Sequence, residues 1–193
     1  MSHTSPSLFD ALKASYGNQQ SQDTLSKFGL KKDPELSNGN ESVYIDPVKH
    51  KLLFSVAGTK SIADIGTDIY LGIGHLKDTN RYKEADRVFK EAKQKYRGYD
   101  TTVTGHSLGG AIAGYIGGSD DKIVTYNKGA TIGQKVRGNE THYRTAGDLV
   151  SLLNANSTHT VNLNNNHHHS GSFIKNSLQA HNLSNIKNDK IFV

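Results

Sequence analysis

The segment from Gly105 to Gly109 has residue types and a spacing that suit nucleophilic chemistry. It reads Gly-His-Ser-Leu-Gly, with Ser107 at its centre and a glycine two positions away on each side. A tight strand-to-helix turn can hold such a serine in strained backbone geometry, and the two glycines leave room for the turn. The helix N-terminus then lies beneath the negative charge that develops on an attacked carbonyl. Ser107 is therefore a candidate nucleophile, and a serine that only caps the helix is the alternative.

The residues on either side of this segment match the elements that such a turn joins. Residues 99–104 are rich in threonine and valine and predict a strand, whereas residues 111–117 are small and apolar and predict a helix. The Gly-x-Ser-x-Gly pattern alone also occurs by chance. Its position between a strand and a helix favours the interpretation as a nucleophile turn.

A serine nucleophile needs a base, and the base needs a carboxylate that orients it. In open α/β sheets these groups lie at the carboxyl ends of strands, in the chain order serine, acid, histidine. Asp148 fits this order because it follows a predicted strand at 142–145 through a turn at Gly147. An N-cap for a helix at 149–153 is its alternative role. The remaining acidic residues after Ser107 precede a strand or follow every histidine: Asp120, Asp121, Glu140 and Asp189.

Five histidines follow Asp148 in the sequence and are candidates for the base. His159 opens a predicted strand and so lies at the wrong edge of the sheet. The run His167–His169 lies at the correct edge within an Asn-rich segment, and His181 follows a short apolar segment. The residues alone leave His181 and the triple-His run as equal candidates. A metal site at the run is disfavoured, because consecutive loop side chains diverge and no acidic partner is near.

Predicted strands and helices alternate along the chain. Strands are predicted at 42–46, 51–57, 99–104, 122–127, 142–145 and 159–163, and helices at 7–13, 62–70, 81–96 and 111–117. The strand at 51–57 is nearly all apolar, as expected for a strand that is covered on both faces. Residues 31–40 are rich in Lys, Asn, Ser and Gly and predict a loop. This alternation predicts the α/β class, with a mostly parallel central sheet flanked by helices.

The length and composition narrow the class of protein further. A chain of 193 residues predicts one domain, 1–193, in which 1–40 form a polar, partly helical N-terminal extension. The absence of cysteine excludes disulfides, thiolate zinc sites and a cysteine nucleophile. No apolar run approaches the roughly 18 residues of a membrane span, and residues 1–6 lack the features of a secretory signal. We therefore expect a soluble protein, cytoplasmic or packaged in a particle.

The net charge alone does not identify a class of binding partner. A net charge of +5 comes mainly from scattered lysines, and no Arg-rich or RNP-like motif is present, so we expect no nucleic-acid partner. The helix predicted at 81–96 carries many charges on one face, which is typical of a face in water. Peripheral contact of the protein with an anionic membrane surface is the alternative use of this charge.

From about Val43 to His181 the sequence resembles the class 3 lipases of the α/β-hydrolase superfamily. The resemblance is strongest at 54–61 and at 103–111, the segment that contains Gly-His-Ser-Leu-Gly-Gly. This family typically has Arg-Gly-Thr or Arg-Gly-Ser after its oxyanion strand, and here Ala57 replaces the arginine. The resemblance implies a compact α/β-hydrolase-like fold and an enzyme that needs no cofactor.

The same resemblance implies roles for individual residues. The family's catalytic carboxylate lies in an Asp-Ile-Val-Pro-like segment, to which the Asp-Leu-Val-Ser sequence beginning at Asp148 is similar. The family's histidine lies near the C-terminus, which favours His181 over the triple-His run. The oxyanion donors implied are the backbone N–H of Leu108 and the N–H of Thr59, assisted by its hydroxyl. For Thr59, an N-cap of the helix at Ile62 is the alternative.

In the family, the segment after the oxyanion residue often forms a lid, which corresponds here to residues 61–76; an ordinary buried helix is the alternative. The resemblance implies a serine ester hydrolase, a lipase, esterase or phospholipase, that cleaves lipid or other acyl esters through an acyl-enzyme on Ser107. The short separations from Ser107 to Asp148 and His181 leave little room for insertions, which favours an esterase with an open site. A non-catalytic binding or particle-structural module on the same fold is the alternative, favoured by the Ala57 departure.

Overall fold

The structure is a computed structural model that describes residues 5–60, 75–129, 134, 136–148, 159–165, 180–187, 191 and 193. Within these residues, seven strands form one sheet in the order of the sequence. They are β1 (Lys31–Lys32), β2 (Glu41–Asp46), β3 (Lys51–Val56), β4 (Asp100–His106), β5 (Lys122–Tyr126), β6 (Glu140–Thr145) and β7 (Thr160–Leu163). The pairs β1–β2 and β2–β3 are antiparallel, and β3 to β7 are parallel. The prediction of a mostly parallel sheet in an α/β fold is confirmed.

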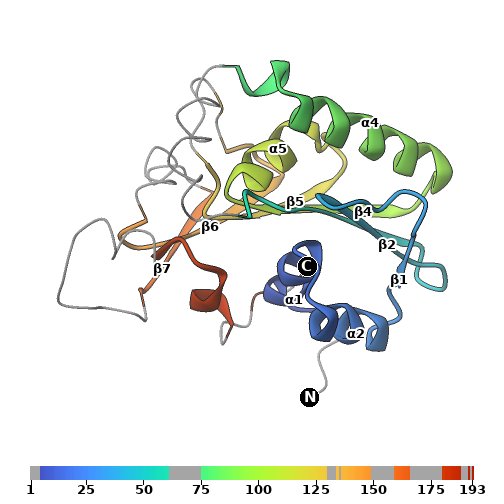
Figure 1. The fold of residues 1–193 in the computed structure, drawn as a ribbon, viewed down its shortest axis with the longest axis horizontal. Coiled ribbons are helices and arrows are strands. Elements are labelled where there is room, and N and C mark those ends of the chain that lie inside the picture. The colour runs from blue at the N-terminus through green and yellow to red at the C-terminus, as the bar shows by residue number, and fades with distance from the viewer. Residues whose placement is uncertain are drawn as a thin grey trace.

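Helices cover both faces of the sheet. They are α1 (Leu8–Ser15), α2 (Gln19–Lys27), α4 (Asn80–Lys95) and α5 (Leu108–Ile116), with short 3-10 turns η1 (Leu76–Asp78) and η3 (Leu183–Ile186). Figure 1 shows α4 and α5 above the sheet and α1 and α2 below it. Successive parallel strands are added to this sheet in one direction. Because crossovers between parallel strands are right-handed, their connecting helices lie on one face of the sheet. The opposite face is left for the N-terminal helices.

The strand β3 is buried on both faces, as its apolar sequence predicts. Leu52, Phe54 and Val56 belong to the core cluster that α4 and α5 share with the sheet. The intervening Leu53 belongs to a second cluster, with Leu25 of α2. The side chains of a strand alternate between faces, so one apolar strand contributes to the core on both sides of the sheet.

The N-terminal helix α1 is part of the core. Leu8 and Leu12 have no exposed surface and pack in a cluster with Val124 and Tyr126 of β5. Ser7 caps the helix by accepting a hydrogen bond from the Asp10 N–H at 3.1 Å. The sequence predicts α1 but not α2, because α2 has few apolar residues: its only buried residues are Ser21 and Leu25.

The other predicted elements agree closely with the structure where it describes them. The loop predicted at 31–40 contains the two-residue strand β1, and Glu140 is the first residue of β6 rather than one that precedes it. Most of the segment predicted as a lid or helix, 61–74, lies outside the described residues, as do 149–158 and His167–His169. Among the described residues, no helix is both long and apolar enough to cross a membrane.

Candidate active site

Ser107 lies in the turn between β4 and α5, in a backbone conformation that residues other than glycine rarely adopt. Its φ is 57° and its ψ is −126°, and such positive-φ residues concentrate at functional sites. Its N–H donates to the Tyr126 carbonyl at 3.2 Å, and its carbonyl accepts from the Gly129 N–H at 2.9 Å. The Ser107 side chain makes no capping hydrogen bond to α5. The strained turn is therefore held by backbone contacts, and its hydroxyl is not used as a helix cap.

The glycines on either side of Ser107 are required by the packing of this turn. A Cβ atom on Gly105 would overlap the carbonyl of Gly109, and one on Gly109 would overlap the carbonyl of Val56 in β3. The two positions hence bring α5 against β3 and β4 without space for any side chain. These steric overlaps explain why the sequence has a glycine two positions before Ser107 and another two positions after it.

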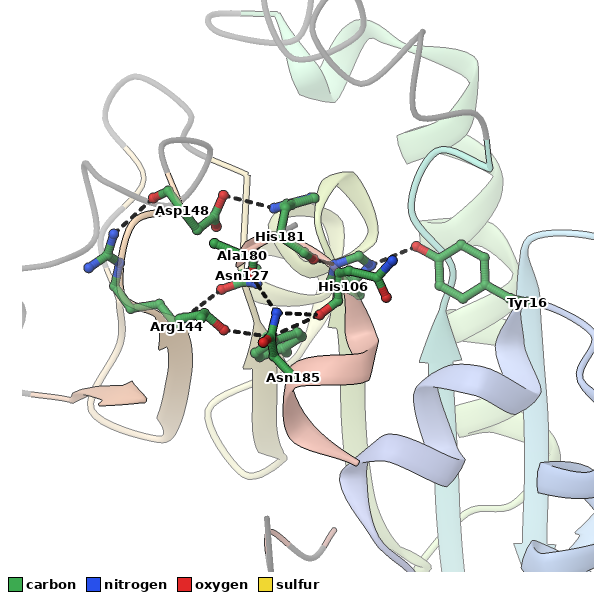
Figure 2. A network of polar contacts seen from close by, with 11 residues as sticks. Tyr16, His106, Asn127, Arg144, Asp148, Ala180, His181 and Asn185 are labelled. Atoms are coloured by element: carbon green, nitrogen blue, oxygen red, sulfur yellow. Dashed lines mark hydrogen bonds and ion pairs between the residues drawn. The ribbon is translucent and has the colours of Figure 1, made fainter. Parts of the chain in front are cut away.

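Asp148 and His181 meet in the interior of the protein. His181 Nδ1 lies 3.1 Å from Asp148 Oδ1, and the two residues are 1% and 0% exposed. Asp148 follows β6 through Gly147, whose φ of 86° suits glycine. The backbone carbonyl of Asp148 accepts a hydrogen bond from Arg144 Nη2 at 2.8 Å. Figure 2 shows these groups, with Arg144 on one side of Asp148 and His181 on the other.

The backbone around His181 is fixed by side chains from the carboxyl ends of β4 and β5. Three successive carbonyls, of residues 180, 181 and 182, each accept a hydrogen bond from one of these side chains. The donors are Asn127 Nδ2 at 2.9 Å, His106 Nε2 at 2.8 Å and the Tyr126 hydroxyl at 3.2 Å. Asn127 also accepts the Thr145 N–H at 2.8 Å, which ties this segment to the end of β6. His181 is thus held by its main chain as well as by Asp148.

His106, the residue before Ser107, is unsuited to act as a base. Burial lowers its pKa to about 3, and both of its ring nitrogens are engaged, with the Tyr16 hydroxyl at 2.8 Å and with the His181 carbonyl at 2.8 Å. Its ring also stacks on that of Tyr126. His106 therefore packs beside the nucleophile turn.

No hydrogen bond joins the side chains of Ser107 and His181 among the described residues. Ser107 Oγ and His181 Nε2 are buried, and neither has a partner within the described part of the chain. Leu108 is the first residue of α5, so its N–H has no acceptor inside the helix. Thr59 follows β3 by way of Gly58, where an added Cβ would lie 3.0 Å from the Ser107 Cβ. The segment that carries Thr59 therefore borders the serine.

Several residues that shape this region are not indicated by the sequence motifs. Asn127 lies just beyond β5, at the sheet edge where ligand-binding groups gather, and that position is a signal that could have identified it. Tyr16 contacts His106 and Gly58, and Arg81 contacts Ala57, each from a distant part of the chain. Nothing in their local sequence indicates those contacts. Among the described residues there is no group of three or more His, Asp or Glu side chains that could hold a metal ion.

Comparison with known protein families assigns the chain to one of them. The model of the family "Lipase (class 3)" matches residues 17–117, just over half of the chain. The chain belongs to the class 3 lipase family. The matched region contains Thr59, Ser107 and Leu108, whereas Asp148 and His181 lie beyond it. Membership identifies the chain as a carboxylic ester hydrolase of the lipase and esterase class, and the non-catalytic alternative is not favoured.

Several solved structures of fungal lipases are similar to this class 3 lipase. A mutant form of MDLA from Penicillium cyclopium is 14% identical, with 88% of this chain and 79% of that chain covered and a TM-score of 0.50. The Lip2 lipase of Yarrowia lipolytica is 17% identical, with 76% and 73% covered and a TM-score of 0.46. The Rhizomucor miehei lipase in its propeptide complex is 14% identical, with 75% and 61% covered and a TM-score of 0.49. No protein of curated function matches the chain.

Proposed function

We propose that this class 3 lipase hydrolyses acyl esters with a triad of Ser107, His181 and Asp148. The proposal rests chiefly on the buried contact between His181 Nδ1 and Asp148 Oδ1. A carboxylate that accepts the Nδ1 proton leaves the Nε2 lone pair as the base. That nitrogen has no other partner among the described residues, and neither has the Ser107 hydroxyl.

The reaction follows from these roles. Ser107 Oγ attacks the acyl carbonyl while His181 Nε2 removes its proton, and the imidazolium that forms is stabilised by Asp148. His181 then gives the proton to the departing alkoxide, which leaves an acyl-enzyme. Water, activated by the same nitrogen, hydrolyses the acyl-enzyme and regenerates the serine. In apo proteins such nucleophile–base contacts are often loose and tighten when substrate binds.

The negative charge on the attacked oxygen needs donors that are already in place. We assign this role to the N–H of Leu108, at the start of α5, and to the N–H of Thr59, with its hydroxyl as a further donor. The N-terminus of α5 adds a positive partial charge at the same point. Loss of one oxyanion donor typically costs about 3–4 kcal/mol of transition-state stabilisation.

The substrate class we propose is a lipid or another acyl ester, and the chemistry requires no cofactor. The family assignment supports lipid esters. The charges on the exposed face of α4 are largely paired with one another, as in Arg87 with Glu84 and Lys90 with Asp86. Contact between this face and an anionic membrane surface stays a prediction.

We also propose that the chain forms one domain in which the N-terminal residues are integral. This is supported by the burial of Leu8 and Leu12 against β5. It is also supported by the Leu8 N–H, which donates to the Ile191 carbonyl at 2.8 Å. Residues 1–40 would then be needed for folding, rather than being an extension that can be removed.

The proposed activity is tested by hydrolysis of p-nitrophenyl esters from acetyl to palmitoyl, with Ser107→Ala as the blank. We expect saturable hydrolysis by the wild-type protein alone. A maximum at short chains identifies an esterase, and a maximum at long chains with activity on emulsions identifies a lipase. Absence of wild-type activity on these esters, on triacylglycerol emulsions and on phospholipid vesicles would contradict the proposal.

A further inference from the structure

The peptide unit between Ala57 and Gly58 is held at both of its polar ends. Arg81 Nη2, from the first turn of α4, donates to the Ala57 carbonyl at 2.6 Å. The Gly58 N–H donates to the hydroxyl of Tyr16, the residue that ends α1, at 2.9 Å. The C=O and N–H of one peptide are parts of the same rigid plane. Two bonds at opposite ends of that plane therefore fix its rotation about the chain.

This peptide has no room to relax sideways. A Cβ atom on Gly58 would lie 2.6 Å from the His106 carbonyl, 2.7 Å from the Tyr16 hydroxyl and 3.0 Å from the Ser107 Cβ. The Gly58 backbone is thus pressed between the nucleophile turn and Tyr16. Thr59, whose N–H we assign to the oxyanion hole, is the next residue along the chain.

The hydrogen bonds of Tyr16 have one consistent direction. The His181 carbonyl can only accept, so His106 Nε2 must carry the proton in their 2.8 Å contact. His106 Nδ1 then accepts from the Tyr16 hydroxyl, which in turn accepts from the Gly58 N–H. Burial lowers the pKa of His106 to about 3 and raises that of Tyr16 to about 12. Both groups therefore stay neutral, and the direction persists, across the pH range in which an esterase is assayed.

This chain of bonds links the oxyanion segment to the main chain of the base. It begins at the Gly58 N–H and ends at the His181 carbonyl, with the Tyr16 hydroxyl and the His106 ring between them. Figure 2 shows Tyr16 approaching His106 from the side opposite His181. Arg81 holds the carbonyl end of the Ala57–Gly58 peptide, so α1 and α4 reach the oxyanion segment from separate parts of the chain.

We propose that Arg81 and Tyr16 are positioning residues of the oxyanion hole, which act through the Ala57–Gly58 peptide to aim the Thr59 N–H at the acyl oxygen. This rests on the proposed ester hydrolysis. Neither residue touches the substrate. Arg81 brings a guanidinium from α4 to the backbone of position 57, where Ala57 stands in place of the family's arginine. The guanidinium that the Ala57-Gly58-Thr59 segment lacks is thus supplied by Arg81 of α4.

The test compares Tyr16→Phe, Arg81→Ala and Arg81→Lys with two matched controls, Tyr115→Phe and Arg87→Ala. Tyr115 lies in the last turn of α5 and packs against the ring of Tyr82. Arg87 is an exposed arginine of the same helix that pairs only with Glu84 and Glu91 among the described residues. We measure kcat and KM for p-nitrophenyl butyrate, and Tm for each variant. We expect Tyr16→Phe and Arg81→Ala to lower kcat about 10- to 100-fold at nearly constant KM, as losses of supporting contacts do. Arg81→Lys should retain more activity than Arg81→Ala, and low millimolar guanidinium should partly restore Arg81→Ala.

Each result has a distinct meaning. A kcat loss with guanidinium rescue supports the positioning role, since a merely structural role would not respond to a small cation in solution. Equal kcat values in the Tyr16, Arg81 and control variants overturn it. A rise in KM without a change in kcat overturns it too, and so does a fall in activity that merely parallels a fall in Tm. Wild-type protein without hydrolysis refutes the proposed function itself and this inference with it.

Discussion

Removing Ser107 and His181 together should reduce ester hydrolysis no further than removing either one. Residues of a triad act as a unit, so the second substitution finds no mechanism left to disable. We expect Ser107→Ala and His181→Ala each to lower kcat by a factor of about 10⁵ to 10⁶. Asp148→Asn should lower it by about 10⁴, because an amide cannot hold the imidazole in the required tautomer. The double variant should match the single ones.

The controls for this experiment are residues of the same types outside the site. His75 is exposed and contacts Asp78, and Asp120 is exposed and accepts a hydrogen bond from Ser119. His75→Ala and Asp120→Asn should keep wild-type kinetics. If His181→Ala keeps most of its activity while Ser107→Ala is inactive, the base is another histidine, with His167–His169 the first candidates. Additive losses in the double variant would contradict a triad.

Replacing one partner of the buried Lys128–Glu140 ion pair should destabilise the protein by about 3–5 kcal/mol. The two side chains have no exposed surface, and Lys128 Nζ lies 2.7 Å from Glu140 Oε1. Thr125 Oγ1 donates to the same carboxylate oxygen at 2.8 Å. Burial lowers the pKa of Lys128, and Glu140 opposes that shift. A single substitution removes one of the two opposite charges from this buried pair.

The Lys128 side chain lies close to the nucleophile turn. Lys128 follows β5 and its side chain passes beneath α5, where Cβ atoms on Gly110 and Gly114 would each approach it to 3.3 Å. The next residue, Gly129, donates to the Ser107 carbonyl. The ion pair therefore supports the backbone contact that holds the nucleophile turn.

Urea denaturation followed by circular dichroism measures this effect. Lys128→Met and Glu140→Gln should each lower the free energy of unfolding by about 3–5 kcal/mol, and the double variant should recover part of that loss because neither charge of the pair remains. The pair of Lys90 and Asp86 on the surface of α4 is the control, and Lys90→Met should leave the free energy of unfolding nearly unchanged. A similarly small change in Lys128→Met would contradict the role assigned to the buried pair.

Local patterns predicted the elements and part of the site. The apolar run of β3 predicted a strand buried on both faces, and the glycines around Ser107 predicted a turn whose packing leaves no room for Cβ atoms. Asp148 could be selected because Gly147 and the preceding strand place it at the carboxyl edge. The order of residues alone did not separate His181 from the triple-His run. The structure places His181 against Asp148, and the other three lie outside the described residues.

The remaining features depend on contacts between residues far apart in the sequence. Arg81 reaches the Ala57 carbonyl and Tyr16 reaches Gly58 and His106, and no periodicity or motif connects these positions. Lys128 and Glu140 look like surface residues in the sequence, because charged side chains are rarely buried unless paired. Helix α2 has too few apolar residues to be predicted, since its packing depends mainly on Leu25.

The central claim is that Ser107 is a nucleophile activated by His181. It is tested most directly by reaction with an alkyl fluorophosphonate, followed by intact-mass measurement and peptide mapping. This reagent bonds covalently to an activated serine, with loss of fluoride. We predict one adduct per chain, located on Ser107, that forms rapidly in the wild type, much more slowly in His181→Ala and not at all in Ser107→Ala. An unlabelled wild type, or an adduct on another residue, would contradict the account.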